Sequence, residues 1–168
     1  GKYPYNETFD SGAFHFVEDS KGKIYRTSNS DLTIYDALGK NHGTVTFDKG
    51  FVLSSNIGIC ELLTKYMDPS IYKEYLDKFG FLKPVNSPFL NNRGGTIFFN
   101  YASEKLSTGF GQAISVNALQ MVQAYSAIFN DGKMVEPFVV DRIENANGKI
   151  VKQYDTTIAG QPISEKTS

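Results

Sequence analysis

The sequence contains one cysteine, Cys60, and no tryptophan among its 168 residues. A single cysteine excludes a disulfide within the chain and any metal site built from several cysteines. Cys60 falls on an apolar helical stripe, so we expect it to lie in the core. The two histidines, His15 and His42, have no acids or other ligands at useful spacing, and we expect both on the surface or in turns. No metal and no cofactor are therefore predicted.

The sequence also lacks an excess of charge and a long apolar run. Its 17 basic and 18 acidic residues give a formal net charge of -1, which argues against binding to nucleic acid or to an anionic membrane surface. No apolar run approaches the ~20 residues needed to span a bilayer, and no signal-like leader opens the chain. If the parent protein is anchored or secreted, we expect that part to lie outside this chain.

The residues that are present are typical of one folded domain, with an apolar share of 40% that includes 13 Phe and 10 Tyr. Aromatic and β-branched runs on either side of Gly22 predict a short hairpin over residues 13–26. Thr46 precedes a short apolar segment, and this pattern predicts one or two helical turns over residues 47–53.

Two further helices are predicted after this segment. The first begins near Ile57, and its apolar stripe consists of Ile59, Cys60, Leu62, Leu63, Tyr66 and Met67. Asp68 followed by Pro69 is typical of an N-cap and a first helical turn, so the second helix is expected to run from there to Gly80.

The second half of the chain begins with residues 81–100, which are rich in Pro, Asn and Gly and predict little regular structure. Asn117 and Gln120 then form a capping-box pattern ahead of another helix. Helical periodicity predicts that the inner face of this helix is formed by Leu119, Val122, Tyr125, Ser126 and Phe129. A strand is predicted over residues 137–143, and the Asn-Gly pair at 147–148 predicts a type I′ hairpin turn. We expect one compact unit.

The stretch FVLSSNIGI, residues 51–59, places Ser54, Ser55 and Asn56 where a helix is expected to begin. Such residues often cap helices, because their oxygens accept hydrogen bonds from free backbone N–H groups. They could also supply a catalytic hydroxyl and a neighbouring amide. From these residues alone, both interpretations stay open.

Several longer segments resemble the transpeptidase domain of class B penicillin-binding proteins, which act in bacterial cell-wall synthesis. GTVTFDKGFVLSSNIGI, residues 43–59, resembles the segment around the second active-site motif of the family, Ser-x-Asn. GFGQAISVNALQMVQAYSAIFNDGKMVEP, residues 109–137, is similar to the Gly-Gln-Gly-Ile-Ser-Val segment of the family and its following helix. YNETFDSGAF, TIYDAL and IAGQPISEKTS resemble further segments, so the likeness extends over nearly the whole chain.

The resemblance implies a mixed α/β (α+β) fold dominated by helices: the helical subdomain of the serine β-lactamase-like transpeptidase fold, with a small β-hairpin. It also implies a D,D-transpeptidase that cross-links peptidoglycan stem peptides through a serine acyl-enzyme and binds β-lactams. By this likeness Ser54 would relay a proton toward the leaving amine, and Asn56 would hydrogen-bond the peptide-like part of the substrate. The implied partners are a D-Ala-D-Ala stem peptide, β-lactam antibiotics and a membrane glycosyltransferase, on the extracytoplasmic side of the plasma membrane in the bacterial cell envelope.

Two other motifs of this machinery, Ser-x-x-Lys and Lys-Thr-Gly, have no convincing match. Ser-x-x-Lys occurs at residues 20–23 and 70–73, but the first lies in a polar turn and the second follows Ser-x-Asn, so we expect surface residues at both. The final Lys-Thr-Ser, residues 166–168, ends in the wrong residue. We therefore expect residues 1–168 to be the middle segment of a transpeptidase domain. Alone it should be inactive, because it lacks the Ser-x-x-Lys nucleophile and a serine without an activating base cannot form an acyl-enzyme.

Ala113 stands where the family commonly has the second glycine of Gly-Gln-Gly. Alanine tolerates positive φ poorly, so the resemblance leaves the backbone geometry of this segment open.

A second reading is a noncatalytic homologue that serves as a scaffold in a cell-wall assembly complex. The intact pair Ser54 and Asn56 favours the enzyme, because a scaffold has no need of it. In either case the parts of the fold outside this chain should leave apolar faces exposed, and such faces predict a homo-oligomer.

Overall fold

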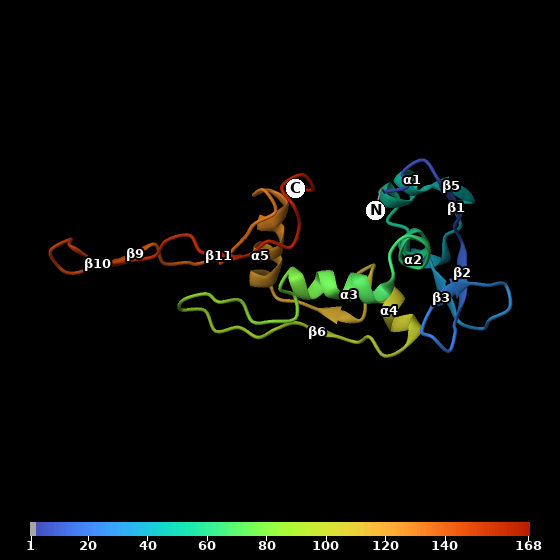
Figure 1. Cartoon of the computed structure of the whole chain (residues 1–168), viewed down its shortest axis with the longest axis horizontal. Helices are drawn as coiled ribbons and strands as arrows, with labels where there is room; N and C mark the ends of the chain where they lie inside the picture. The colour runs from blue at the N-terminus through green and yellow to red at the C-terminus, as the bar shows by residue number, and fades with distance from the viewer. Residues whose placement is uncertain (1–2) are drawn as a thin grey trace. The chain divides into compact units, whose positions relative to one another are not determined.

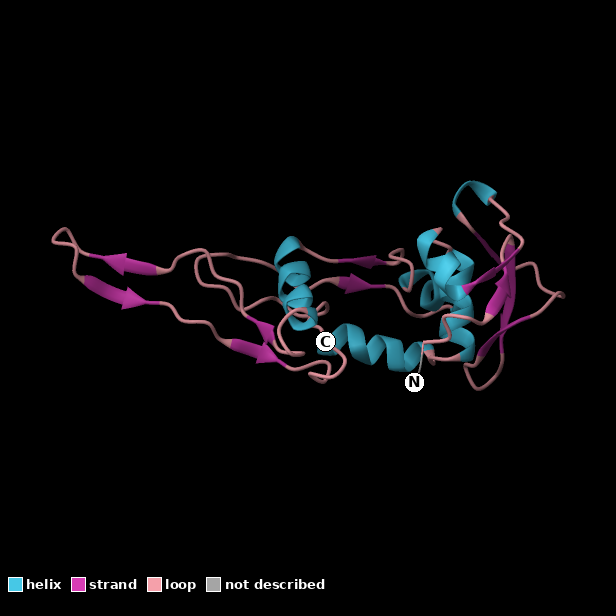
Figure 2. Ribbon diagram, turned by 90° about the horizontal axis from the view of Figure 1, so that it is seen from above, coloured by secondary structure: helices cyan, strands magenta, loops and turns pink. Residues whose placement is uncertain are grey.

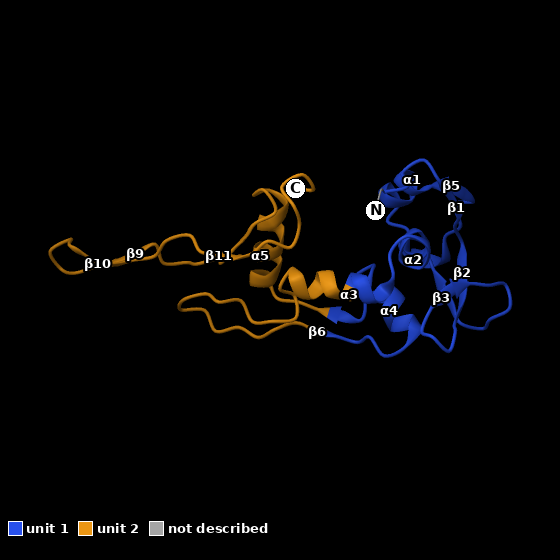
Figure 3. Ribbon diagram, in the orientation of Figure 1, with its two compact units in different colours: residues 1–72, 97–114 blue, residues 73–96, 115–168 orange. Residues whose placement is uncertain are grey.

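The computed structural model describes residues 3–168, and it mixes helices with small sheets (Figures 1 and 2). The structure is 28% helical and 20% strand, which agrees with the predicted mixed class. The chain divides into two compact units, one formed by residues up to 72 with 97–114 and the other by 73–96 with 115–168 (Figure 3). The sequence patterns predicted a single unit.

The first unit contains most of the strands of the N-terminal half. Its elements are β1 (Thr8–Asp10), β2 (Ala13–Glu18), β3 (Ile24–Arg26), β4 (Thr33–Tyr35), the 3-10 turn η1 (Ala37–Gly39), β5 (Thr44–Thr46), α1 (Phe47–Val52), α2 (Asn56–Lys65) and α4 (Ala102–Thr108). The second unit contains α5 (Ala118–Ile128), β8 (Met134–Val135), β9 (Arg142–Glu144), β10 (Ile150–Gln153) and β11 (Ile158–Gly160). The division between the units falls within α3 (Pro69–Lys78), β6 (Thr96–Ile97) and β7 (Ile114–Ser115).

The sheet of the first unit has the order β3-β2-β4, and β2 pairs antiparallel with both neighbours. The predicted hairpin over residues 13–26 is confirmed, since β2 and β3 form it with Phe16 opposite Arg26. Its turn includes Gly22 at φ +80°, a backbone conformation that residues with a Cβ rarely adopt. β1 pairs separately with β5, with Phe9 opposite Val45.

The core of the first unit lies between this sheet and α2. Alternate residues of β2 point inward, so Phe14 and Phe16 are buried, and Ile57 and Cys60 of α2 are buried in the same cluster. Cys60 is fully buried, as predicted, and burial raises the pKa of its thiol. This helix-on-sheet contact holds the N-terminal half of α2 against the sheet.

A buried carboxylate also joins α2 to the sheet. Glu61 is 1% exposed, and its Oε1 accepts a hydrogen bond of 2.6 Å from the Arg26 guanidinium. Arg26 also donates to the carbonyls of Asp10 and Ala13, at 3.0 and 2.6 Å. Lys65 Nζ lies 2.7 Å from the second oxygen of Glu61, outside hydrogen-bond geometry. The buried charge is thus paired on both oxygens, as such a charge requires.

The predicted helix starts are largely confirmed. Thr46 caps α1 by accepting from the Lys49 N–H at 3.2 Å. Asp68 accepts from the backbone N–H of Ser70 at 2.8 Å at the start of α3, and the bonds from Ser70 lower the pKa of this carboxyl. Asn117 and Gln120 form the predicted capping box of α5.

The predicted inner face of α5 is wrong in this unit. Val122, Tyr125 and Phe129 are exposed to 57%, 52% and 81%, whereas Gln120 and Gln123 are buried. The Gln120 side-chain amide donates to the carbonyls of Phe81 and Lys83, at 2.7 and 2.8 Å. These carbonyls lie outside helices and strands, and that of Phe81 also accepts from the Gly95 N–H at 2.9 Å, so a buried amide donor satisfies this segment better than an apolar side chain.

The predicted strand over residues 137–143 is mostly wrong, because β9 covers only Arg142–Glu144. The hairpin β9–β10 exists, but its turn is not type I′. A type I′ turn needs positive φ at both central residues, and of the Asn-Gly pair only Gly148, at +75°, has it. The Asn145 side chain instead accepts from the backbone N–H groups of Asn147 and Lys149, both at 3.0 Å.

The irregular character predicted for residues 81–100 is confirmed apart from the two residues of β6 in it, Thr96 and Ile97. Among residues 3–168, no helix is both long and apolar enough to cross a bilayer. Exposed apolar side chains are present, as expected, and α5 carries several of them.

Ala113 adopts φ +57°, a left-handed conformation. Its carbonyl accepts from the Phe98 N–H at 2.8 Å, and Gly111 beside it is at φ +85°. The segment therefore keeps a geometry that suits glycine although alanine stands there.

The Gln120→Leu variant should lower the free energy of unfolding by roughly 2–3 kcal/mol, because leucine fills a similar volume but removes the donor to the Lys83 carbonyl and the acceptor of the Asn117 N–H. Urea unfolding would measure this. Gln112→Leu, at an exposed glutamine, is the matched control and should change stability by less than about 0.5 kcal/mol. Equal stability of the two variants would contradict the assigned role of Gln120.

The Ala113→Gly variant should raise the free energy of unfolding by about 0.5 kcal/mol or more. Relief of left-handed strain, about 1–2 kcal/mol, outweighs the added entropy of the unfolded chain, about 0.4–1 kcal/mol. Ala124→Gly within α5 is the control, and it should lower stability by about 1 kcal/mol or more. A loss of stability in Ala113→Gly would show that alanine is not strained there.

Candidate functional site

The stretch Ser54 to Asn56 lies between α1 and α2. The end of α1 is closed by backbone hydrogen bonds from the N–H of Ser54 to the Phe51 carbonyl, at 3.0 Å, and from the N–H of Ser55 to the Gly50 carbonyl, at 2.9 Å. Ser54 has φ +54°, a conformation that reverses the chain between the two helices. These backbone bonds close the end of α1, and none of them uses the side chains of Ser54, Ser55 or Asn56.

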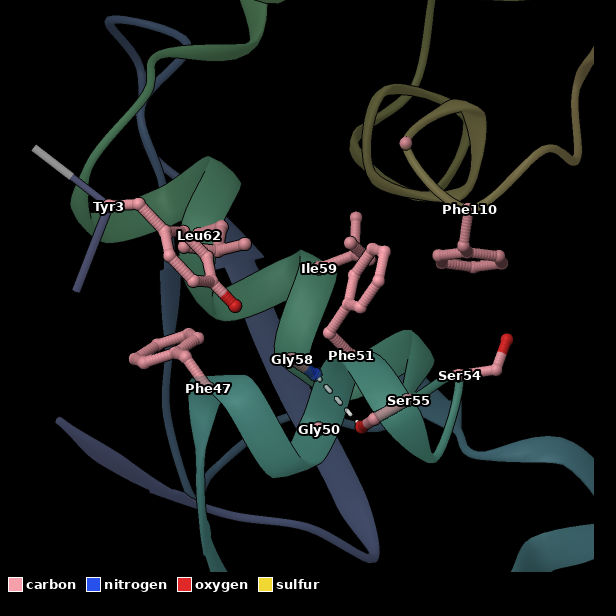
Figure 4. Close-up of a pocket in the computed structure, with 11 residues that line it drawn as sticks. Tyr3, Phe47, Gly50, Phe51, Ser54, Ser55, Gly58, Ile59, Leu62 and Phe110 are labelled. Atoms are coloured by element: carbon pink, nitrogen blue, oxygen red, sulfur yellow. Dashed lines mark hydrogen bonds between the residues drawn. The ribbon is translucent and has the colours of Figure 1, made fainter. Parts of the chain in front are cut away.

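Ser54 is exposed, and its hydroxyl has no hydrogen-bond partner among the residues that the structure describes. Figure 4 shows this hydroxyl turned away from the side chain of Ser55 and on the side of the Phe110 ring. A non-glycine residue with positive φ is uncommon and costs on the order of 1 kcal/mol or more. Such strain is often found where a side chain must be presented to a ligand.

Ser55 is the helix cap of the group. It is 5% exposed, its Oγ accepts from the Gly58 N–H at 3.0 Å, and its hydroxyl donates to the Asp36 carboxylate at 2.9 Å (Figure 4 shows the bond to Gly58). Of the interpretations left open for this stretch, capping is thus the one that the structure shows for Ser55.

Asn56 is the first residue of α2 and is half-buried. Its Nδ2 donates to the Tyr35 carbonyl at 2.9 Å. Within residues 3–168, the second N–H of this amide and its oxygen form no hydrogen bond. The amide is therefore oriented by the end of β4 and keeps one donor and one acceptor for another group.

Asp36 was not singled out in the sequence, although it stands in the segment TIYDAL. It follows β4 directly and is 4% exposed. Its carboxylate accepts from Ser55 Oγ and from the Ile57 N–H, at 2.9 and 3.1 Å. An acid that ends a strand and is followed by a short 3-10 turn was the available signal, but it is too common to point to a partner about twenty residues later.

A cavity of about 320 Å³ lies beside this turn in the first unit. Its lining includes Ser54, Ser55, Phe51 and Phe110, while Asn56 is not part of it (Figure 4). Tyr3 also lines the cavity, and burial together with the Asp48 carboxylate raises the pKa of its phenol. The wall is thus largely apolar, with the Ser54 hydroxyl at one end.

The histidines take no part in this site. His15 lies in β2, half-buried, with Nδ1 2.8 Å from the Thr33 hydroxyl, so the prediction of a surface or turn position is wrong for it. His42 is exposed, as predicted. Within residues 3–168, no group of three or more His, Cys, Asp or Glu side chains could hold a metal ion.

The two Ser-x-x-Lys matches lie where expected. Ser20 is exposed in the turn between β2 and β3. Ser70 is exposed in the first turn of α3, and its hydroxyl donates to Asp68 at 2.6 Å. Neither serine lies in the lining of the cavity beside Ser54.

Comparison with protein families identifies the relationship. The family model described as "Penicillin binding protein transpeptidase domain" matches residues 8–168. This chain belongs to that family. The penicillin-binding protein resemblance that was based on Ser54, Asn56 and the flanking segments is thereby confirmed at the level of the family.

Named relatives agree with this assignment. The chain is 27% identical over 146 residues to a "Peptidoglycan D,D-transpeptidase FtsI homolog" of Mesostigma viride, covering 82% of this chain and 22% of the relative. It is 32% identical over 132 residues to "Stage V sporulation protein D" of Bacillus subtilis, covering 76% of this chain and 20% of the relative. The chain thus spans about a fifth of the length of these curated relatives.

Solved structures have the same fold. Penicillin Binding Protein 2X from Streptococcus thermophilus aligns with a TM-score of 0.76 at 26% identity, covering 97% of this chain and 22% of that one. Penicillin-binding protein A from M. tuberculosis, in a structure described as a ceftriaxone acyl-enzyme complex, aligns with a TM-score of 0.78 at 16% identity, covering 97% and 35%. The predicted β-lactamase-like transpeptidase fold is thus confirmed.

Substitutions of the two neighbouring serines should change the stability of this penicillin-binding protein family member by different amounts. Ser55→Ala removes a helix cap and a buried donor to Asp36, so the free energy of unfolding should fall by about 1–3 kcal/mol. Ser54→Ala removes a hydroxyl without a recorded partner and should change it by less than about 0.5 kcal/mol. Urea unfolding of both variants tests this, and a larger loss for Ser54→Ala would contradict the geometry described.

Proposed function

We propose that this chain is part of a peptidoglycan D,D-transpeptidase, an enzyme that cross-links stem peptides through a serine acyl-enzyme. Membership of the transpeptidase family supports an acyl-transfer enzyme at the level of the family. The observation that carries the finer proposal is the conformation of Ser54. Its hydroxyl is exposed and forms no hydrogen bond within residues 3–168, while the side chains of Ser55 and Asn56 are bonded to residues 35 and 36.

Ser54 has the role of a proton relay in this proposal. In acyl transfer, the hydroxyl of a nucleophilic serine attacks the carbonyl between the two D-alanines, and the peptide bond breaks with loss of the terminal D-alanine. The leaving nitrogen must receive a proton, and a hydroxyl can accept one and donate another within the same step. The free Ser54 hydroxyl suits this task.

Asn56 holds the substrate in place in this proposal. The bond from its Nδ2 to the Tyr35 carbonyl restricts the orientation of the amide. Its remaining N–H can donate to a peptide carbonyl and its oxygen can accept from a peptide N–H, which is the pattern that an extended stem peptide offers. β-Lactams present a similar amide, and they belong to the same proposal as ligands.

In this proposal, two further parts of the machinery lie in the parent protein outside these 168 residues. They are the nucleophile and the motif that binds the terminal carboxylate. The domain assignment made from the sequence, a middle segment of the transpeptidase domain, is kept as part of it. A membrane glycosyltransferase as partner, and action on the extracytoplasmic side of the plasma membrane, are further parts. Homo-oligomers of the isolated chain would form through exposed apolar side chains such as Val122 and Phe129.

A fluorescent penicillin tests the proposal. A parent protein that carries both other motifs should be labelled covalently, whereas the 168-residue chain should not, because it has no base-activated nucleophile. If a folded parent protein with both other motifs remains unlabelled, the noncatalytic scaffold becomes the better interpretation. Labelling of the isolated chain would contradict the assignment of the nucleophile.

In the parent protein, Ser54→Ala and Asn56→Ala should each lower the rate of penicillin acylation by roughly 10²-fold or more, since each removes a group that acts in the transition state. Ser20→Ala is the matched control, because Ser20 is an exposed serine in a turn away from the cavity. An unchanged rate in Ser54→Ala would exclude the proton relay.

A further inference from the structure

We infer that Asp36 is a positioning residue for the Ser54–Asn56 turn, and that it sets the rate of acyl transfer without touching the substrate. This inference rests on the function proposed above and extends it to a residue outside the Ser-x-Asn pair.

The first observation is where the Asp36 carboxylate forms its bonds. Asp36 stands at the N-cap of η1, yet its side chain makes no cap hydrogen bond there. It accepts instead from the hydroxyl of Ser55, with Oδ1 and Oδ2 at 2.9 and 3.0 Å, and from the Ile57 N–H at 3.1 Å. Both donors belong to the turn or to the first residues of α2.

The second observation is that the neighbouring residue holds the other side of the same turn. The Tyr35 carbonyl accepts from Asn56 Nδ2 at 2.9 Å. The last residue of β4 and the residue after it therefore restrain Ser55, Asn56 and Ile57, and none of these bonds includes the side chain of Ser54. The restraints leave Ser54 at φ +54° with its hydroxyl exposed.

The third observation is burial. Asp36 is 4% exposed and Ser55 is 5% exposed, so their bond lies away from water and is stronger than the same bond on the surface. The carboxylate also lies at the N-terminus of the ten-residue helix α2, where the helix dipole favours a negative charge. A rigid connection of this kind keeps a strained turn in one conformation.

Loss of the Asp36 bonds should change the distance between the Ser54 hydroxyl and the leaving nitrogen. A misplacement of a reacting group by about 1 Å can cost on the order of 10²-fold in rate. If Asp36 no longer holds Ser55 and Ile57, the turn can relax toward negative φ at Ser54, and the hydroxyl of Ser54 then moves away from the leaving nitrogen. Substrate affinity should change less than the rate, because Asp36 does not touch the substrate.

The test compares variants of the parent protein in acylation by a fluorescent penicillin, with each rate normalised to the labelled endpoint so that unfolded protein does not count. Asp36→Ala should lower the limiting rate of acylation at least about tenfold, with a smaller change in the concentration that gives half the limiting rate. Asp36→Asn should recover most of the rate, since its amide oxygen can still accept from the Ile57 N–H. Ser55→Ala removes the same bond from the other side and should also slow acylation.

Asp19→Ala is the matched control, because this carboxylate accepts from the backbone N–H groups of Lys21 and Lys23 in the turn between β2 and β3, outside the cavity lining, and its loss should leave the normalised rate unchanged. A second readout uses the 168-residue chain, in which Asp36→Ala should speed amide hydrogen exchange at Ile57 more than at Leu63. Wild-type normalised rates in both Asp36→Ala and Ser55→Ala would overturn the inference. Absence of labelling in the unmutated parent protein would instead overturn the proposed function, and with it the role of Asp36 in the reaction.

Discussion

The packing of α2 on the β3-β2-β4 sheet is the contact on which the candidate site depends. Ile57 and Cys60 anchor the helix in the core, and Glu61 joins it to Arg26 at the edge of the sheet. A helix held at several points along one face cannot shift its N-terminus without breaking those contacts. The core therefore determines the position of the turn that carries Ser54, although it contains neither Ser54 nor Asn56.

Buried polar side chains form the specific connections in both units. Glu61 joins α2 to Arg26 of the edge strand β3, and Asp36 joins α2 to the end of the other edge strand, β4. Gln120 joins α5 to the irregular segment after α3. Each accepts from or donates to groups that lie far away in the sequence. Because an unpaired buried polar group is costly, these bonds favour one arrangement of each unit over its alternatives.

The α5 helix shows how far periodicity can mislead. Its amphipathic pattern is real, yet within the unit the small and amide side chains face inward and the large apolar side chains are exposed. Periodicity reports that a helix has two different faces, and it does not report which partner each face meets. A local pattern also misleads at the hairpin β9–β10, because hydrogen bonds to the Asn145 side chain, and not the Asn-Gly pair, determine the conformation of its loop.

The sequence by itself determined the features that depend on neighbours in the chain. The caps at Thr46, Ser55 and Asn117 and the burial of Cys60 were predictable, because they follow from local hydrogen bonding and from helical spacing. The resemblance to penicillin-binding proteins was also readable, since it depends on ordered residues. Only the tertiary structure decided that Asp36 holds the turn and that Ser54 is left free. Those facts depend on contacts between residues about twenty positions apart, which no local pattern encodes.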